Sequence, residues 1–308
     1  MNKNLNGIDI SEFNGDIDFK KVKNEVDFIY IRATYGRFGI DKRFKEYTEN
    51  CIKYNIPLGF YYYSYATSEA DSETEVKHFL DTIELYKENV VFPLMLDMED
   101  ADGYKVKNGN PNSEVLSKIC KVACEKIASS GFIPIIYACE DWFINRLDKE
   151  IIKDYLKCVA FWETQEDKID KTKYSMWQYT SKGKVQGIKG NVDKDYSFVD
   201  FIKLKEYTLN VSRINFIKSK TLLSDIVLQY FSCYKHGNEL ISRLYSGLKD
   251  SDKLVYKELN LEGKKKEVKK FFNFEQKTID YLSNFIYAED TFTILYNAIC
   301  GKTLEVKE

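Results

Sequence analysis

Histidine is scarce in this chain of 308 residues, and the two that exist, His78 and His236, lie in different halves of the sequence. Zinc enzymes, Ser-His-Asp hydrolases and Cys-His hydrolases all need histidine beside further ligands or a nucleophile. Seven cysteines are present, which is an odd number, and no pair has C-x-x-C spacing. We therefore expect no metal site, no cofactor, and no catalysis that depends on histidine or on a thiolate.

Long apolar runs are also missing. No stretch approaches the roughly 20 apolar residues that span a bilayer, and the segment MNKNLNGIDISEFNG lacks the apolar core of a signal peptide. The formal net charge of −2 argues against nucleic acid and strongly anionic membranes as partners. Most cysteines lie in apolar runs, which is typical of reduced thiols. We expect synthesis in a reducing cytoplasm without a signal peptide, and no membrane insertion.

The first 200 residues alternate between strand-like and helix-like segments. Strand-like apolar runs lie at 28–34, 58–65, 90–99, 132–139, 158–163 and 174–179. Between them, apolar residues recur at helical spacing over 41–55, over 71–87, and from Ser113, which we expect to cap its helix. Near-continuous apolar strands are typical of parallel sheets that are buried on both faces. The alternation predicts an α/β fold, most simply a barrel of parallel strands.

The pattern changes near residue 204. All four prolines lie at or before Pro134, strand-like runs fade, and helical stripes appear, as at Leu240, Leu244 and Leu248. No internal repeat and no low-complexity linker are evident. We predict two domains, a barrel over residues 1–203 and a separate all-α bundle of about three to five helices over residues 204–308.

Asp97 and Glu99 end a strongly apolar strand-like run, LMLDME. They are two residues apart, so both side chains leave the same face of the strand, about 6–7 Å apart. In a barrel of parallel strands the C-terminal strand ends open into the active site. Lost hydration and mutual repulsion raise a carboxyl pKa and can keep one acid protonated near neutral pH. Such a pair suits the cleavage of a glycosidic bond, and helix capping or salt bridging is the alternative.

Further acids and aromatic residues follow other predicted strands. Asp9 lies in GIDIS, and Asp193 and Asp195 lie in NVDKD. Each acid alone is more often an ordinary loop residue, but together they are predicted to converge on one barrel mouth. Tyrosines crowd residues 61–65, and residues 177–179 read Trp-Gln-Tyr. Aromatic faces at strand ends suit sugar stacking, and filling of the core is the alternative.

Five motifs occur in the order seen in glycoside hydrolase family 25: GIDIS at 7–11, GFYYYSYA at 59–66, LMLDME at 94–99, MWQYT at 176–180 and GIKGNVDKD at 187–195. From residue 5 to about 200 the chain resembles these Chalaropsis-type N-acetylmuramidases, which are common among phage endolysins and bacterial autolysins. The resemblance implies an irregular β/α barrel with five helices and eight strands. It also implies cleavage of the β-1,4 bond between N-acetylmuramic acid and N-acetylglucosamine in peptidoglycan.

The resemblance also implies roles for matching positions. Glu99 would be the general acid, Asp97 would orient the substrate 2-acetamido group or stabilise charge, and Asp9 and Asp193 would complete the acid cluster. Residues expected to contact the sugars are Tyr62, Tyr65, Trp177, Arg32, Gln178 and Asp195. Attack by the substrate's own acetamido group and displacement by water both stay open.

Two positions depart from the family pattern. Tyr35 stands where many members carry a glutamate, although others have an aromatic residue there. The tryptophan of the common L-W-I-A strand is displaced to Trp162. These departures affect the expected wall of one sugar subsite and leave the acid cluster unchanged.

Other functions compete with this interpretation. A sugar-binding barrel without catalysis would have lost the acid set, and a metal-dependent polysaccharide deacetylase needs histidine ligands, of which the barrel offers only His78. For residues 204–308 we expect binding to a cell-wall ligand, and the alternative is an oligomerisation or partner-binding bundle. The pattern favours a phage endolysin that acts on peptidoglycan glycan strands of Gram-positive walls after holin-type release.

Overall fold

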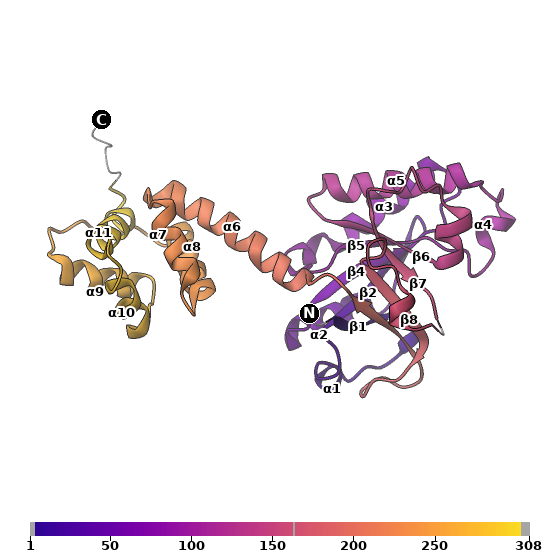
Figure 1. Ribbon diagram of the computed structural model, residues 1–308, viewed down its shortest axis with the longest axis horizontal. Coiled ribbons are helices and arrows are strands. Elements are labelled where there is room, and N and C mark those ends of the chain that lie inside the picture. The colour runs from indigo at the N-terminus through magenta and orange to yellow at the C-terminus, as the bar shows by residue number, and fades with distance from the viewer. Residues whose placement is uncertain (1–3, 163, 303–308) are drawn as a thin grey trace. The chain divides into compact units, whose positions relative to one another are not determined.

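The computed structural model describes residues 4–162 and 164–302, and Figure 1 shows its ribbon. The chain divides between Ile202 and Lys203 into two compact units. Glu163, the end of one predicted strand, and the side chain of Cys233 lie outside the described residues. Among the helices that the structure describes, none is long and apolar enough to cross a membrane.

Eight strands close a barrel in the first unit, in the order β1-β9-β8-β7-β6-β5-β4-β2, with β2 pairing back to β1. Their bounds are Leu5–Ile10 (β1), Phe28–Tyr35 (β2), Leu58–Tyr63 (β4), Leu94–Asp97 (β5), Pro134–Cys139 (β6), Leu156–Ala160 (β7), Met176–Gly183 (β8) and Val192–Ser197 (β9). The short strand β3 (Gly39–Ile40) pairs only with β2, outside the ring. The predicted barrel is confirmed.

One strand departs from the parallel arrangement that the sequence predicts. β9 runs antiparallel to both of its neighbours, β1 and β8. The connection from β8 to β9 covers only residues 184–191, which is too short for the crossover that parallel neighbours need. This reversed strand carries Asp193 and Asp195 and makes the barrel irregular.

Five α-helices accompany the barrel within the described part of the first unit. They are α1 (Phe19–Val22), α2 (Phe44–Tyr54), α3 (Glu69–Ile83), α4 (Tyr104–Lys107) and α5 (Ser113–Ser129). The predicted helical segments correspond to α2, α3 and α5, and their apolar faces pack on the strands. The expected cap of α5 is wrong by one residue, because the Asn112 side chain accepts the hydrogen bond from the Val115 amide at 3.0 Å.

Successive strand residues face opposite sides of the barrel wall. Ile29 and Ile31 of β2 belong to the core between the strands and the helices. Phe28 and Tyr30 belong to a second core, which also holds Met95 and fills the barrel interior. Above that apolar floor, the strand ends carry polar side chains into the open mouth. The outer face of the barrel wall is therefore apolar where it meets the helices, whereas the inner face is apolar at the floor and polar at the mouth.

The described part of the second unit consists of helices and connecting segments, the longest of which covers residues 251–260. Its elements are α6 (Phe201–Thr221), which begins at the unit boundary, α7 (Asp225–Cys233), α8 (Gly237–Asp250), α9 (Leu261–Phe271), α10 (Gln276–Ser283) and α11 (Ala288–Ile299). They enclose their own hydrophobic core, centred on residues such as Phe231, Leu244 and Phe292. The predicted helical region is confirmed, and the structure describes six helices where three to five were expected.

Candidate active site

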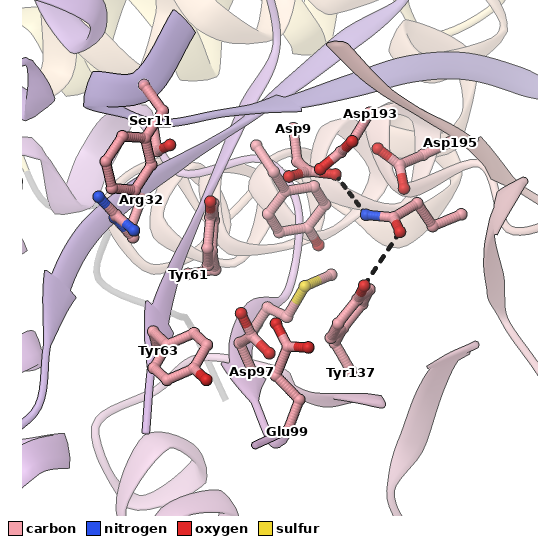
Figure 2. A pocket seen from close by; sticks show the side chains of 14 residues that line it. Asp9, Ser11, Arg32, Tyr61, Tyr63, Asp97, Glu99, Tyr137, Asp193 and Asp195 are labelled. Carbon is pink, nitrogen blue, oxygen red and sulfur yellow. Dashed lines mark hydrogen bonds between the residues drawn. The ribbon is translucent and has the colours of Figure 1, made fainter. Parts of the chain in front are cut away.

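A cavity of about 220 Å³ opens at the barrel mouth. Figure 2 shows it with five carboxyl groups directed toward a common space. Its lining residues are Asp9, Ser11, Phe13, Tyr30, Arg32, Tyr61, Tyr63, Met95, Asp97, Glu99, Tyr137, Gln178, Asp193 and Asp195. All four acids predicted as catalytic therefore line one cavity, and Arg32, Gln178 and Asp195 line it with them.

Strand register explains how distant acids meet. Asp9 of β1 pairs with Asp193 of β9 in the antiparallel ladder, and Asp195 pairs with Gln178 of β8. Across the barrel, Asp97 is the last residue of β5, and Glu99 follows it by two positions, so both point inward. Figure 2 accordingly shows Asp97 and Glu99 on one side of the cavity and the three β1 and β9 acids on the other.

Gln178 links the acids to the aromatic wall. Its side-chain nitrogen donates to Asp9 Oδ2 at 2.8 Å, and its carbonyl oxygen accepts from the Tyr137 hydroxyl at 3.0 Å. The Trp162 indole nitrogen donates to the same oxygen at 3.0 Å. Because Gln178 is almost fully buried, these bonds fix its amide orientation. The chain thus holds Asp9 in place with a neutral donor.

Burial dominates the electrostatics of the cluster. It raises the pKa of Asp9, Asp97 and Asp195 well above the ordinary value for aspartate, and a neighbouring carboxylate raises each pKa further. Burial also raises the pKa of Asp193 to about 6. Like charges this close cannot all ionise near neutral pH. The cluster therefore retains protons at a pH where isolated carboxyls have lost theirs.

Glu99 has a mixed environment. Burial raises its pKa, the positive charge of Lys105 opposes this shift, and the negative charges of Asp193 and Asp102 add to it. A carboxyl that keeps its proton next to an ionised partner can donate that proton to a leaving oxygen. The raised pKa of Glu99 favours its protonated form, and Asp97 is the acid two residues before it.

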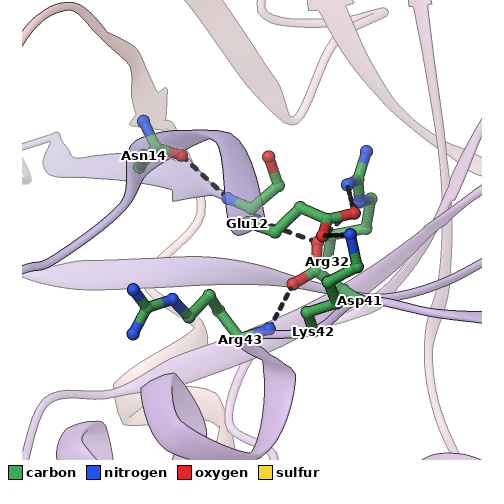
Figure 3. A network of polar contacts seen from close by, with 7 residues as sticks. Glu12, Asn14, Arg32, Asp41, Lys42 and Arg43 are labelled. Atoms are coloured by element: carbon green, nitrogen blue, oxygen red, sulfur yellow. Dashed lines mark hydrogen bonds and ion pairs between the residues drawn. The ribbon is translucent and has the colours of Figure 1, made fainter.

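Arg32 is held rigidly in the cavity wall by acids outside the cluster, as Figure 3 shows. Its Nε donates to Asp41 Oδ2 at 2.9 Å, and its Nη2 lies 3.3 Å from Glu12 Oε1. Asp41 also accepts from the backbone amides of Glu12 and Arg43. The Phe13 ring, which is largely exposed, lies 4.9 Å from the guanidinium. Arg32 thus presents a fixed positive charge beside an exposed aromatic face.

Three predicted sugar contacts lie elsewhere. Tyr62 is fully buried on the outer side of β4, where its ring packs 4.9 Å from that of Phe79. Trp177 is also buried on the outer face, and its indole nitrogen donates to the Phe161 carbonyl. These two predictions are wrong because strand alternation turns both side chains away from the mouth. Tyr65 lines neighbouring cavities and does not line the one around the acids.

The residues that sequence reasoning missed have the opposite parity. Tyr61 and Tyr63 of β4 face inward, with Tyr63 in register with Asp97. Tyr137 of β6 is likewise in register with Asp97. These three tyrosines line the cavity with aromatic rings, which are suited to stacking against sugar rings. Among the residues that the structure describes, no group of three or more His, Cys, Asp or Glu side chains is arranged to hold a metal ion.

Comparison with known proteins agrees with this geometry. The profile of glycosyl hydrolases family 25 matches residues 8–188. The autolytic lysozyme of Clostridium acetobutylicum is 29% identical over 192 residues, which cover 62% of this chain and 55% of that protein. The chain thus spans about half the length of that relative.

Two solved structures extend the comparison. The modular autolysin LytC from Streptococcus pneumoniae, in complex with a synthetic peptidoglycan ligand, matches with a TM-score of 0.57 at 30% identity. That match covers 63% of this chain and 47% of LytC. The CTP1L endolysin matches with a TM-score of 0.54 at 25% identity, over 65% of this chain and 68% of its own. These matched lengths correspond to the first unit of the chain.

Proposed function

The chain belongs to family 25 of the glycosyl hydrolases, and we propose on that premise that it is an N-acetylmuramidase. It would cut the β-1,4 bond between N-acetylmuramic acid and N-acetylglucosamine in peptidoglycan. The observation that carries the proposal is the meeting of Asp97 and Glu99 with Asp9 and Asp193 in one cavity. A non-catalytic descendant of the barrel would have no need to retain all four acids.

We assign the general acid to Glu99. Its proton passes to the glycosidic oxygen as the bond from that oxygen to the sugar C1 breaks, and the leaving sugar departs as an alcohol. Asp97 then faces the positive charge that develops at C1, or accepts a hydrogen bond from the acetamido N–H. Its Oδ1 is buried and has no hydrogen-bond partner among the described residues, so it is free to accept one from substrate.

Two routes complete the reaction. In the first, the acetamido oxygen of the substrate attacks C1, and water later opens the ring that forms. In the second, a water molecule attacks C1 directly. Both routes use the Glu99 proton in the first step, so the role of Glu99 does not depend on the choice. The inward tyrosines Tyr61, Tyr63 and Tyr137 supply faces and hydroxyls for the sugar rings.

The identity of the new reducing ends tests the proposal. We expect digestion of purified peptidoglycan to release fragments whose reducing ends, after borohydride reduction and acid hydrolysis, contain muramicitol. Reduced glucosamine at the new ends would mean that the enzyme cuts the other glycosidic bond. The absence of any new reducing end would contradict the glycosidase assignment itself.

We further propose that the protein acts as a phage endolysin on Gram-positive walls, reached through holin-type release. Similarity to the CTP1L endolysin supports this setting. The free cysteines Cys51, Cys120, Cys124 and Cys158 are buried thiols, which suits synthesis in a reducing compartment. For the helical unit we propose attachment to a wall ligand, since the barrel supplies the catalytic groups.

A further inference from the structure

The helices of the second unit recur at a constant interval. Tyr230 in α7 and Tyr281 in α10 are 51 residues apart, and the same interval separates the first residues of α7 and α10 and those of α8 and α11. The turns before α7 and α10 are separated by the same 51 residues. There, Leu222 and Asn273 both adopt left-handed backbone conformations, with φ of 59° and 51°, which non-glycine residues seldom do.

Buried positions follow the same interval. The pairs that occupy equivalent places are Ile217 and Val268, Leu223 and Phe274, Leu228 and Ile279, Phe231 and Leu282, Ile241 and Phe292, Leu244 and Leu295, and Leu248 and Ile299. Every member of these pairs is a buried apolar residue. The end of α6 with α7 and α8 therefore has the same burial pattern as α9 with α10 and α11.

The two sets meet through a reciprocal contact. The Tyr230 hydroxyl donates to the Tyr281 carbonyl at 3.0 Å, and the Tyr281 hydroxyl donates to the Tyr230 carbonyl at 2.7 Å. Their rings stack with centroids 4.4 Å apart. Each tyrosine also stacks at 4.1 Å on an aromatic residue of the other set, Tyr230 on Phe285 and Tyr281 on Tyr234. Tyr234 and Phe285 are themselves equivalent positions.

Reciprocity of this kind is the signature of a two-fold interface, in which residue i contacts j and j contacts i. We infer that the helical unit is a tandem duplication of one module, and that its two copies pair with each other inside the chain through this tyrosine interface. No internal repeat was expected from the residue types. Few equivalent positions keep the same residue type, so the repeat lies in the burial pattern and not in a letter-by-letter match.

The paired arrangement bears on the role of the unit. A face that pairs with its own copy would make a lone module dimerise, but here the copy is present in the same chain and fills that face. Self-association through this face is therefore not available to a second chain. This step rests on the proposed wall attachment. Two equivalent modules would present two equivalent binding surfaces, which suits a wall polymer that offers repeated binding sites.

Composition-matched exchanges in the full chain test the duplication. Tyr234→Phe with Phe285→Tyr swaps residues between equivalent positions, and we expect the melting temperature of the helical unit to stay within about 2 °C. Tyr230→Phe with Phe285→Tyr makes the same exchange between non-equivalent positions and removes one crossed hydrogen bond. We expect it to lower that temperature by about 4–8 °C. Equal losses from the two exchanges would overturn the equivalence.

Two further measurements separate the pairing from the wall-binding role. Light scattering should give the mass of one chain, and a dimer that Tyr230→Ala dissociates would overturn internal pairing. Sedimentation of the full chain with purified cell walls, using Glu99→Gln to prevent digestion, tests attachment. Loss of wall binding after Tyr230→Ala, with the barrel's melting transition unchanged, supports attachment through paired modules. Wall binding that survives unpairing contradicts the bivalent arrangement but leaves the duplication intact.

A second observation, in the barrel, concerns a buried lysine behind the acid cluster. Lys105 of α4 is almost fully buried, and its Nζ donates to the Glu99 carbonyl at 2.8 Å and to the Ser64 carbonyl. Ser64 follows β4 and Glu99 follows β5, so one ammonium group joins the ends of two neighbouring strands. Asp100 fixes the start of α4 by accepting from the Lys105 and Val106 amides.

Glu75 of α3 holds the same strand end from another side. Its carboxylate accepts from the Ser64 hydroxyl at 2.7 Å and from the Tyr65 amide at 3.0 Å. We propose that Lys105 is a positioning residue, which holds the backbone that carries Glu99 and places a positive charge behind the acids. This rests on the proposed role of Glu99.

The charge of Lys105 opposes the effect of burial on the pKa of Glu99 and of Asp97. The other titratable groups that face Glu99 are Asp9, Tyr63, Asp97, Asp102, Tyr137 and Asp193. All of these are acids or phenols, and Lys105 is the cation that lowers the pKa of Glu99, while Arg32 of the same cavity lowers that of Asp97. Removal of Lys105 therefore raises the pKa of Glu99.

Lys105→Met tests this role against Lys107→Met, which removes an exposed lysine from the same helix. We expect Lys105→Met to lower kcat by about 10–100-fold with KM within about twofold, and to move the alkaline limb of the kcat profile to higher pH. The sign follows because a general acid works while protonated, and its pKa rises when the cation is lost. Lys107→Met should leave both unchanged.

Two variants keep the proposal open to refutation if the methionine variant fails to fold. Lys105→Arg retains the charge and should leave the alkaline limb in place. Lys105→Gln retains a donor without the charge and should move the limb upward. A fall in kcat without any movement of the limb in Lys105→Gln would reduce Lys105 to a merely structural residue.

Discussion

The Glu99→Gln variant is expected to stop releasing reducing ends from purified peptidoglycan, with kcat falling by roughly 10²–10⁴-fold. Glutamine keeps the shape and polarity of the side chain but has no proton to give to the leaving oxygen. The fold should survive. Because burial raises the pKa of Glu99, the ionised form is unfavourable in the folded state, and its contribution to stability falls as pH rises through that pKa. At high pH the variant should therefore melt no lower than the parent.

Glu114→Gln is the matched control. It makes the same chemical change at an exposed position on α5, where Glu114 pairs with Lys118 at 2.7 Å. Exposed pairs of this kind contribute little to stability, so both activity and melting temperature should match the parent. Near-full activity in Glu99→Gln would remove the general-acid role. An aryl glycoside with an acidic leaving group needs no proton donor, so activity toward it should largely return.

The acid cluster could be predicted from the sequence because the placement of its acids follows from short sequence spacings and from their positions at strand ends. Two acids at i and i+2 on an apolar strand must share a face, and strand ends of a barrel must meet at its mouth. The barrel class followed from strand–helix alternation in the same way. The reversed direction of β9 did not, since it depends on how a short connection returns the chain beside β1.

The tyrosine predictions failed for a physical reason. Both faces of a barrel strand are buried, so an apolar run such as LGFYYY does not reveal which face looks inward. A signal was nevertheless present. Tyr62 shares its parity with Leu58 and Phe60, the most apolar residues of β4, and such residues belong against the helices. Tyr61 and Tyr63 share the other face, which becomes polar toward the mouth.

Lys105 and the duplicated module were invisible for different reasons. A lysine in the polar stretch 100–110 looks solvated, and only the fold shows two strand-end carbonyls meeting around it. In the helical unit, equivalent core positions exchange leucine, isoleucine, valine and phenylalanine, which cores of equal volume tolerate. The repeat shows in the spacing of the helices, in the buried positions and in the reciprocal bonds of Tyr230 and Tyr281, all of which require the fold.

Asp97→Asn should lower kcat by roughly 10²–10³-fold, the cost of losing one charge-stabilising group aimed at a transition state. Asparagine keeps the size of the side chain and can still accept a hydrogen bond from the acetamido N–H, but it cannot offset positive charge at C1. The loss should persist with an aryl glycoside that has an acidic leaving group, because charge develops at C1 whatever group departs. That persistence separates Asp97 from Glu99, whose variant regains activity with the same substrate.

Asp141→Asn, on the exposed start of the segment after β6, is the control and should retain parental rates on both substrates. Recovery of Asp97→Asn on the activated substrate would mean that Asp97 acts by holding the proton on Glu99, and the assignment of the two acids would have to be revised.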